Sequence, residues 1–569
     1  MLKSFGTRRS FLGGMAALAG AGFLAGAGSR PGFAQSATGS MIFHGGPILT
    51  MDADNPRAEA VVVNNGRIVA IGALADVAGA AGAGARVIDL QGRTLMPGFI
   101  DPHLHPISVV SNDMIDVSPM TIPTMDGVMA ALRAAGAAAA PGEWVQAQLF
   151  DPSIITGGRP PTLAELDAVL PGNPLLLMEG NGHVAYANSL ALAAANVSRD
   201  TPDPPQGRYI HDAAGNLTGR LEETPAFLPF FNLLPLASPD QVVVRLKDLF
   251  AHAASVGCTG LHDCGIGTLS GAGDLDLLTA AMTADAPVRL RGMLVSTHFD
   301  AWEARGLKPG FGDDLFRVGG MKAWSDGSNQ AQTGFMRENY LNSDARGALN
   351  YTPQALTEAI RRAHAGGWQV GVHANGDAGI DVTLDAFETV LRENPRDGHR
   401  HRIEHASVLH PEHIARMVVM GLSPSFLIGH VRWWGRAFRD RILGPERAQF
   451  YDPCASALAA GLRISLHSDW SVTPIEPLRM VEDAVARVMN EGGEVFFPDE
   501  RIPVDAALRA VTRDAAWQCG MDDITGSLEV GKYADFVLLE SDATAAEPTA
   551  ISAIKVSETW LGGEQRHGA

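Results

Sequence analysis

Cysteine is scarce in this chain, which has four cysteines in 569 residues. So few cannot form a disulfide framework in a chain of this length, and no CxxC or Cys/His spacing of a structural zinc site occurs. Cys258 and Cys264 lie six residues apart in one expected strand, too far to bridge, so we expect buried thiols. Whether Cys454 and Cys519 form a disulfide is left open by the sequence.

Basic residues are also few, with 44 Lys and Arg against 63 Asp and Glu, a formal net charge of −19. No Lys/Arg-rich run offsets this balance, which excludes nucleic acid as a partner because nothing would neutralise its phosphates. The composition, 46% apolar and 19% charged, is that of a globular protein. At this length we expect one large domain and a smaller one.

Long apolar runs are missing as well. Only residues 1–34 have the pattern of a targeting segment. Residues 7–12 (TRRSFL) make a twin-arginine pattern, followed by a weakly apolar stretch to about residue 28 and a cleavage point after Ala34. We therefore predict a signal peptide, export by the twin-arginine machinery to the periplasm, and no stable membrane association after cleavage. An uncleaved membrane anchor would need a longer and more apolar stretch.

Both ends of the remaining chain show short strand patterns with turn residues between them. Residues 41–95 alternate β-branched side chains with Asn-Gly punctuation, and residues 525–569 show the same pattern. The economical interpretation is one composite β-sandwich built from both ranges.

Between these ends, apolar strand candidates alternate with helical periodicity, which is typical of a parallel α/β fold. Eight units indicate a (β/α)8 TIM-like barrel over 96–524, with an insertion at about 107–250. The expected strands are 94–101, 256–263, 287–296, 317–325, 368–374, 401–406, 421–426 and 463–469. In such a barrel the chemistry lies at the carboxyl ends of the strands.

Side chains able to bind a metal stand at those predicted strand ends. His103 and His105 alternate along the first strand and should face the same way. The full set is His103, His105, Lys322, His373, His405 and Asp469. Each alone has a structural explanation, as a buried histidine, a snorkelling lysine or a turn-forming aspartate. Their common position at the barrel rim favours a metal centre.

These motifs resemble the metal-dependent amidohydrolase superfamily, specifically the amidohydrolase-3 or YtcJ-like group, over nearly the whole chain after the signal segment. The matching stretches are 97–105 (PGFIDPHLH), 322–328 (KAWSDGS), 373–377 (HANGD), 402–406 (RIEHA), 468–470 (SDW) and 531–535 (GKYAD). The resemblance implies a barrel joined to a composite sandwich and one or two divalent metal ions. It also implies that His103 and His105 bind the more buried ion, Lys322 is a carboxylated bridge, and His373 and His405 bind the second.

The residue types suit this chemistry. Imidazoles and a carboxylate fit zinc, which lowers the pKa of bound water from 15.7 to about 7 and supplies a nucleophile at neutral pH. A Lys322 ammonium would be repelled by the ion, so we favour a carbamate on family grounds. Asp469 is placed to accept the proton of the attacking water and pass it to the leaving nitrogen.

Further candidates surround this centre. His183, in the insertion, matches a family motif and either polarises the substrate carbonyl as a catalytic residue or is structural. Glu223 takes the acidic position of another motif (219–223, GRLEE) and is expected to bind substrate, and His467 is expected to face the pocket. Three tryptophans near the strand ends predict a pocket for an apolar or aromatic group, although core packing explains a share of them: Trp324, Trp434 and Trp470.

We therefore predict a metal-dependent hydrolase that cleaves an amide, formamide or lactam carbon–nitrogen bond of a small molecule. A deaminase of the same superfamily is the first alternative, but its His-x-x-Glu shuttle is missing where residues 373–376 read HANG. A non-catalytic periplasmic binding protein is the second. A homodimer is left open.

Overall fold

The computed structural model describes residues 39–111, 113–205, 207–235 and 237–568. The predicted signal peptide at 1–34 lies outside these residues. Within them no helix combines the length and the apolar character needed to cross a bilayer. All four cysteines are buried free thiols, so Cys454 and Cys519 are not paired.

The two chain ends form one sheet. Strand β21 runs antiparallel to β5, with Phe536 opposite Pro97, so the C-terminal strands extend the N-terminal ones. A buried cluster that includes Phe43, Phe536 and Trp560 packs on this sheet; its closure into a sandwich remains a prediction. The strands are β1 (Met41–Leu49), β2 (Arg57–Asn64), β3 (Arg67–Gly72), β4 (Arg86–Asp89), β5 (Thr94–Pro97), β21 (Phe536–Leu539), β22 (Val556–Leu561) and β23 (Glu564–His567), with the short helix α2 (Leu74–Val77).

The central element is a parallel sheet of eight strands that closes into a barrel, which confirms the predicted α/β barrel fold. The strands, in order around the sheet, are β6 (Phe99–Leu104), β13 (Cys258–Ile266), β14 (Arg289–Val295), β16 (Phe316–Trp324), β17 (Gln369–Ala374), β18 (Arg402–His405), β19 (Ser423–Phe426) and β20 (Ser465–Leu466). A parallel bridge between Leu104 and Trp470 joins the last strand to the first, and the Asp469 N–H donates to the His103 carbonyl at 3.1 Å. This closure brings residues about 365 positions apart in the sequence together.

The first barrel strand is shorter and later than the expected 94–101. The chain divides at Gly98, so that β5 pairs in the terminal sheet and β6 begins the barrel. The Gly98 N–H donates to the Asp535 carbonyl at 3.0 Å, and a Cβ at Gly98 would lie 2.1 Å from the Thr259 side chain. Only glycine fits this close approach between the two sheets.

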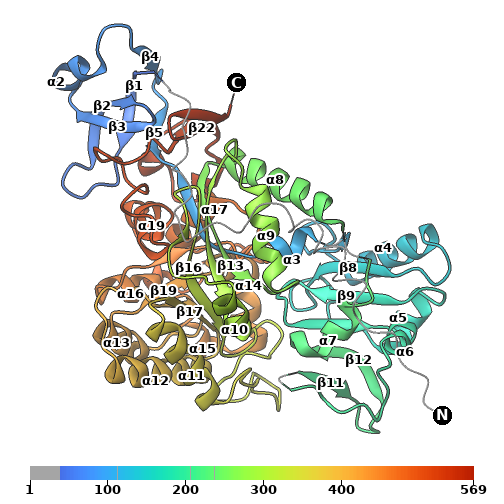
Figure 1. Cartoon of the computed structure of the whole chain (residues 1–569). Helices are drawn as coiled ribbons and strands as arrows, with labels where there is room; N and C mark the ends of the chain where they lie inside the picture. Colours follow the sequence, from blue (N-terminus) through green and yellow to red (C-terminus); the bar gives the residue numbers. More distant parts are fainter. Residues whose placement is uncertain (1–38, 112, 206, 236, 569) are drawn as a thin grey trace.

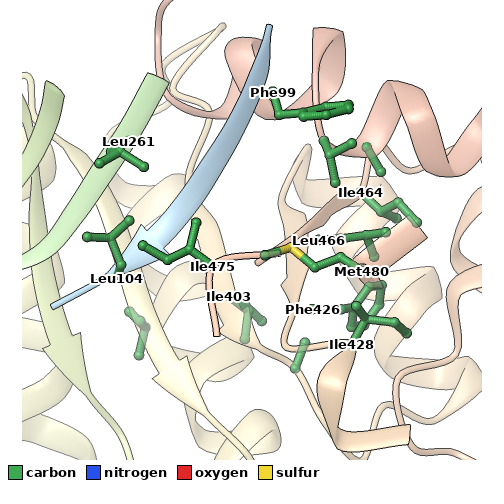
Figure 2. Packing of buried hydrophobic residues seen from close by; sticks show 14 of the residues in the cluster. Phe99, Leu104, Leu261, Ile403, Phe426, Ile428, Ile464, Leu466, Ile475 and Met480 are labelled. Carbon is green, nitrogen blue, oxygen red and sulfur yellow. The ribbon is translucent and has the colours of Figure 1, made fainter. Parts of the chain in front are cut away.

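Helices follow the barrel strands and cover its outside (Figure 1). They are α8 (Pro239–Ser255), α9 (Ala272–Ala281), α10 (Phe299–Ala304), α11 (Pro353–Ala365), α12 (Asp377–Glu393), α13 (Pro411–Met420), α14 (Gly429–Ala437), α15 (Pro445–Ala448), α16 (Cys454–Ala459), α17 (Pro477–Ala486), α18 (Val504–Ala510) and α19 (Arg513–Gln518). One large apolar cluster unites strands and helices. Figure 2 shows part of it near the barrel closure, where Leu466 and Phe426 lie close to Met480 of α17 and Leu104 lies near Ile475.

Between β6 and β13 the chain forms a separate six-stranded sheet. Its strands are β7 (Ile115–Asp116), β8 (Val145–Phe150), β9 (Leu175–Glu179), β10 (Val184–Ala187), β11 (Arg208–His211) and β12 (Leu217–Glu222). Helices α3 (Pro106–Val110), α4 (Met125–Ala138), α5 (Leu163–Val169), α6 (Ser189–Ala194) and α7 (Thr224–Phe231) accompany it. Figure 1 shows this insertion in cyan and green beside the barrel.

Candidate metal centre

Nitrogen and oxygen atoms from three barrel strands converge at the carboxyl end of β6. His103 Nε2 lies 3.3 Å from His105 Nε2, 3.1 Å from Lys322 Nζ and 3.5 Å from Asp469 Oδ1. The same Asp469 oxygen is 3.3 Å from His105 Nε2. The structure therefore places His103 and His105 side by side, as the alternation predicts, although β6 ends at Leu104 and His105 begins the turn into α3.

The protonation of His103 is set by a buried ion pair beneath it. His103 Nδ1–H donates to Glu404 Oε2 at 2.7 Å, and Arg402 holds the same carboxylate at 2.6 and 2.8 Å. Burial opposes the charge of Glu404, yet Arg402 and His103 hold its pKa well below its ordinary value. Burial also lowers the pKa of His103, so the ring is neutral with its lone pair on Nε2. A carboxylate behind a ligand histidine fixes both the tautomer and the ring orientation.

Two more histidines lie next to this group. The His373 ring is 4.5 Å from the His405 ring between centroids, and His405 is 4.9 Å from His103. His373 Nε2–H donates to the Gly327 carbonyl at 2.9 Å, which leaves Nδ1 as its lone-pair nitrogen. His405 Nε2 lies 3.9 Å from Asp469 Oδ2. Burial lowers the pKa of both rings well below the ordinary histidine value, so both are neutral.

Asp469 is held at the barrel closure by a constrained backbone. Its φ is +50°, an unusual value for a residue with a side chain. Beside it, Ser468 donates from its N–H and its hydroxyl to the buried carboxyl of Asp101 at 3.3 and 2.5 Å. Although burial would raise it, the imidazoles of His103 and His105 hold the pKa of Asp469 well below its ordinary value. Asp469 is therefore an anion.

Lys322 is fully buried inside the barrel on β16. Burial lowers the pKa of its amine. Its Nζ reaches the His103 Nε2 nitrogen and lies 5.3 Å from the centre of the Trp324 ring. Lys322 is thus part of the convergent group and not a snorkelling surface lysine.

The insertion contributes a His–Glu pair to the same region. His183 Nδ1–H donates to Glu223 Oε2 at 2.9 Å, and the Glu223 N–H donates to the His183 carbonyl at 2.8 Å. Burial alone would lower the pKa of His183, but the charge of Glu223 and this hydrogen bond raise it overall. The His183 ring lies 5.0 Å from that of His373. Glu223 therefore contacts the His183 ring.

The remaining candidates differ in their surroundings. His467 is fully buried, stacks on His103 with centroids 4.6 Å apart, and donates from Nε2 to the Ser425 carbonyl, so it supports a ligand instead of facing a pocket. Burial lowers the pKa of His467 to about 3. Trp434 is buried and its indole N–H donates to Asp151 of the insertion at 2.7 Å. Trp324 and Trp470 are partly exposed.

A divalent cation fits these donors. Neutral imidazole nitrogens and an anionic carboxylate are the ligand types that zinc and similar ions take. His103, His405 and Asp469 present ligand atoms that all lie within 4.8 Å of one another. Asp469 Oδ1 is buried and receives no well-formed hydrogen bond from the described residues, although two imidazole nitrogens approach it. A cation would complete the coordination of this oxygen.

A sequence model of the amidohydrolase family matches residues 86–567. This chain belongs to the amidohydrolase family. It is 31% identical to an N-substituted formamide deformylase of Arthrobacter pascens over 91% of this chain and 97% of that protein. It is 28% identical to the putative amidohydrolase YtcJ of Bacillus subtilis strain 168, over 92% and 98% of the two chains.

The fold agrees with this assignment. An uncharacterised metal-dependent hydrolase from Pyrococcus horikoshii OT3 superimposes with a TM-score of 0.70 at 22% identity, covering 90% of this amidohydrolase and 99% of that chain. The predicted superfamily and its YtcJ-like group are thereby confirmed.

Three supporting residues of this amidohydrolase were not assigned from the sequence. They are Asp101, Arg402 and Glu404, which hold Ser468 and His103 in place. A signal was present, because Asp101 stands two residues before His103 and Arg402 two before Glu404. In a strand such pairs share a face. Charged residues on the inner face of a buried strand need partners, and those partners come from distant strands.

Proposed function

We propose that this amidohydrolase cleaves the carbon–nitrogen bond of a small non-peptide amide, formamide or lactam, with an N-substituted formamide as the first candidate substrate. Family membership sets the reaction class. The relative named for formamide deformylation matches nearly full length, which supports the substrate choice. The observation that carries the proposal is the convergence of His105 Nε2, Lys322 Nζ and Asp469 Oδ1 within 3.5 Å of His103 Nε2.

The residues that would hold the metal are those predicted from the sequence. His103 and His105 offer Nε2, His373 offers Nδ1, and His405 and Asp469 complete the group. We propose zinc, one or two ions per chain. When bound, such an ion acts as a Lewis acid and lowers the pKa of water to about 7.

Lys322 is proposed to carry a carbamate. An unmodified ammonium at this position would stand among metal ligands, 3.1 Å from His103 Nε2, and be repelled by a divalent cation. Conversion to a carbamate would replace the positive charge with two oxygen donors beside the ligand group. The full burial of the side chain would shield such a modification from water.

Asp469 and His183 are proposed to handle protons and the substrate carbonyl. Asp469 is an anion, so with Oδ1 given to the cation its other oxygen, Oδ2, can accept a proton from water and return it to the leaving nitrogen. Glu223 holds Nδ1 of His183, which leaves Nε2 for a substrate carbonyl oxygen. Trp324 and Trp470, both partly exposed, would contact the substrate's apolar group.

Deamination is the less favoured alternative. The residue three positions after His373 is Gly376, whose N–H donates to Asp326 Oδ2 at 2.8 Å, and it has no carboxylate to shuttle a proton. Export by the twin-arginine pathway, a periplasmic location and a homodimer are kept as proposals; the signal segment lies outside the described residues.

The test uses purified chain loaded with zinc or manganese. Paired substrates that differ only in the acyl group, an N-benzylformamide and the matching acetamide, are assayed with a lactam and a cyclic amidine. Formate release from the formamide, lost in Asp469→Asn but retained in the surface variant Arg416→Met, is expected. Ammonia release from the amidine alone would favour a deaminase. Fewer than one tightly bound divalent ion per chain, with no activity on metal addition, would overturn the hydrolase assignment.

A further inference from the structure

Four arginines gather at the amino-terminal ends of the barrel strands, opposite the metal centre. Arg289 and Arg291 lie on β14, Arg317 lies beside Arg291 on β16, and Arg402 begins β18. Burying a guanidinium is costly unless a carboxylate balances its charge. The partners of each arginine can therefore be compared directly.

Two of these arginines bind a carboxylate through the same edge of the guanidinium. Arg289 donates from Nε and Nη2 to the two oxygens of Asp535 at 2.7 and 3.1 Å. Arg402 donates from Nε and Nη2 to the two oxygens of Glu404 at 2.8 and 2.6 Å. These are bidentate pairs, the strong geometry for a guanidinium and a planar anion.

Arg317 also has a carboxylate, because its Nη2 donates to Asp314 Oδ1 at 2.7 Å. The other Asp314 oxygen accepts from the Tyr533 hydroxyl at 3.0 Å. Both oxygens of Asp314 are therefore engaged by side chains other than Arg291.

Arg291 is different. Only 2% of its surface is exposed, and its Nη1 donates to the carbonyls of Leu290 and Asp314 at 3.1 and 3.4 Å. Its Nε and Nη2 are buried and have no hydrogen-bond partner among the described residues. This is the edge that holds a carboxylate in Arg289 and Arg402. The four guanidiniums thus share three carboxylates. Arg291 is the arginine without a carboxylate, and its Nε/Nη2 edge has no hydrogen-bond partner among the described residues.

We propose that the Nε/Nη2 edge of Arg291 binds a small monovalent anion inside the barrel, either a halide such as chloride or a small planar oxyanion such as formate. Both ligand types accept two N–H groups and supply the missing charge. The burial of Arg291 limits the ligand to a few atoms.

The neighbouring groups support a bound anion. Burial and the adjacent arginines lower the pKa of Arg291 to about 9, so the side chain still carries its charge at neutral pH. Two groups near Arg291 can carry negative charge: Asp314, whose two oxygens are engaged by Arg317 and Tyr533, and Cys519, which would have to be a thiolate. Burial raises the pKa of Cys519 to about 12, so the thiol remains neutral.

The test measures the Tm of the full, metal-loaded chain in sodium chloride, bromide or formate against sodium gluconate, at constant ionic strength. Binding to the folded state alone stabilises it in proportion to the logarithm of the free anion concentration. A Tm rise of about 1–3 °C between 1 and 100 mM anion is expected. A response to formate but not to halides identifies an oxyanion site, and a response to both identifies a general monoanion site.

Variants assign the effect to one side chain. Arg291→Met should abolish the anion dependence, whereas Arg416→Met, which removes a partly exposed arginine on α13, should retain it. Cys519→Ala should also retain the anion dependence of the Tm. If the Cys519→Ala variant lost this dependence, the counter-charge would be assigned to the thiolate and the proposal would be overturned. Anomalous diffraction from wild-type crystals in bromide provides a check that needs no variant. A bromide beside Arg291 supports the site, whereas water there, or a Tm that is equal in all four salts, overturns it.

Discussion

Replacing Glu404 with glutamine is expected to weaken metal binding without direct contact between residue 404 and the metal. Glu404 Oε2 accepts from both His103 Nδ1 and Arg402 Nη2, and Oε1 accepts from Arg402 Nε. A glutamine amide has one acceptor oxygen. If the glutamine NH2 takes the place of Oε1, this donor faces the Nε–H donor of Arg402. If the NH2 takes the place of Oε2, it donates to His103 Nδ1, and the ring proton moves to Nε2, the nitrogen that would bind the metal.

Either orientation of the glutamine should reduce both metal affinity and stability. Loss of the carboxylate behind a ligand histidine typically costs 10- to 100-fold in metal affinity, about 1.4–2.8 kcal/mol. Leaving the fully buried Arg402 without its carboxylate should lower the free energy of unfolding by about 3 kcal/mol. Chelator competition measures the affinity, and denaturant unfolding of the metal-free chain measures the stability.

Controls separate positioning from folding. Glu388→Gln removes a surface carboxylate that pairs with Arg416, and should change stability by less than about 1 kcal/mol and leave metal affinity unchanged. The double variant Arg402→Met/Glu404→Gln should recover part of the stability, because no unpaired charge remains, but not the affinity. Wild-type affinity in Glu404→Gln would refute the positioning role.

Other predictions address the ligand set and the fold. Lys322→Ala should lose bound metal and regain some activity with a small carboxylic acid; normal activity would exclude a carbamate. Asp469→Asn should lower kcat at least about 100-fold, the lower range for a positioned general base, and a variant that turns over normally would remove Asp469 from the mechanism. Nδ1 of His401 accepts the Val370 N–H, so the ring proton of His401 is on Nε2. This Nε2–H points at His364 Nδ1, 2.8 Å away, and that nitrogen can accept it only when His364 is also neutral. Because burial lowers the pKa of both rings below the unfolded value of 6.5, the unfolded chain takes up more protons at these two sites, and their contribution lowers the Tm as the pH drops from 7 to 5. His364→Phe should reduce this slope.

Much of the barrel could be read from the chain because parallel strands are short apolar runs with local periodicity. The first strand was misplaced, since the division at Gly98 depends on Thr259 and Asp535, which are distant in sequence. The candidate ligands at the strand ends were predicted from one general rule, that the carboxyl ends of a barrel's strands meet at one rim.

The roles of three side chains required the assembled structure. Glu223 contacts His183 because β10 and β12 are paired in the insertion sheet. His467 lies under His103 instead of facing outwards. Glu404 reaches His103 from a strand 301 residues away in the sequence. The spacing of Arg402 and Glu404 indicates that both need partners, but no local pattern identifies His103 as the partner, or predicts the contacts of Glu223 and His467.

The sequence by itself determined the residue types of the centre, their order along the chain and the strand ends that carry them, because these depend on local pattern and on a rule of the fold. Only the tertiary structure decided which nitrogen of each histidine is available, which carboxylate supports which ring, and that the Nε/Nη2 edge of Arg291 has no hydrogen-bond partner among the described residues. Hydrogen-bond direction and charge balance depend on atoms within about 3 Å of one another. For the His103-Leu104-His105 segment, those atoms come from β16, β18 and the barrel closure.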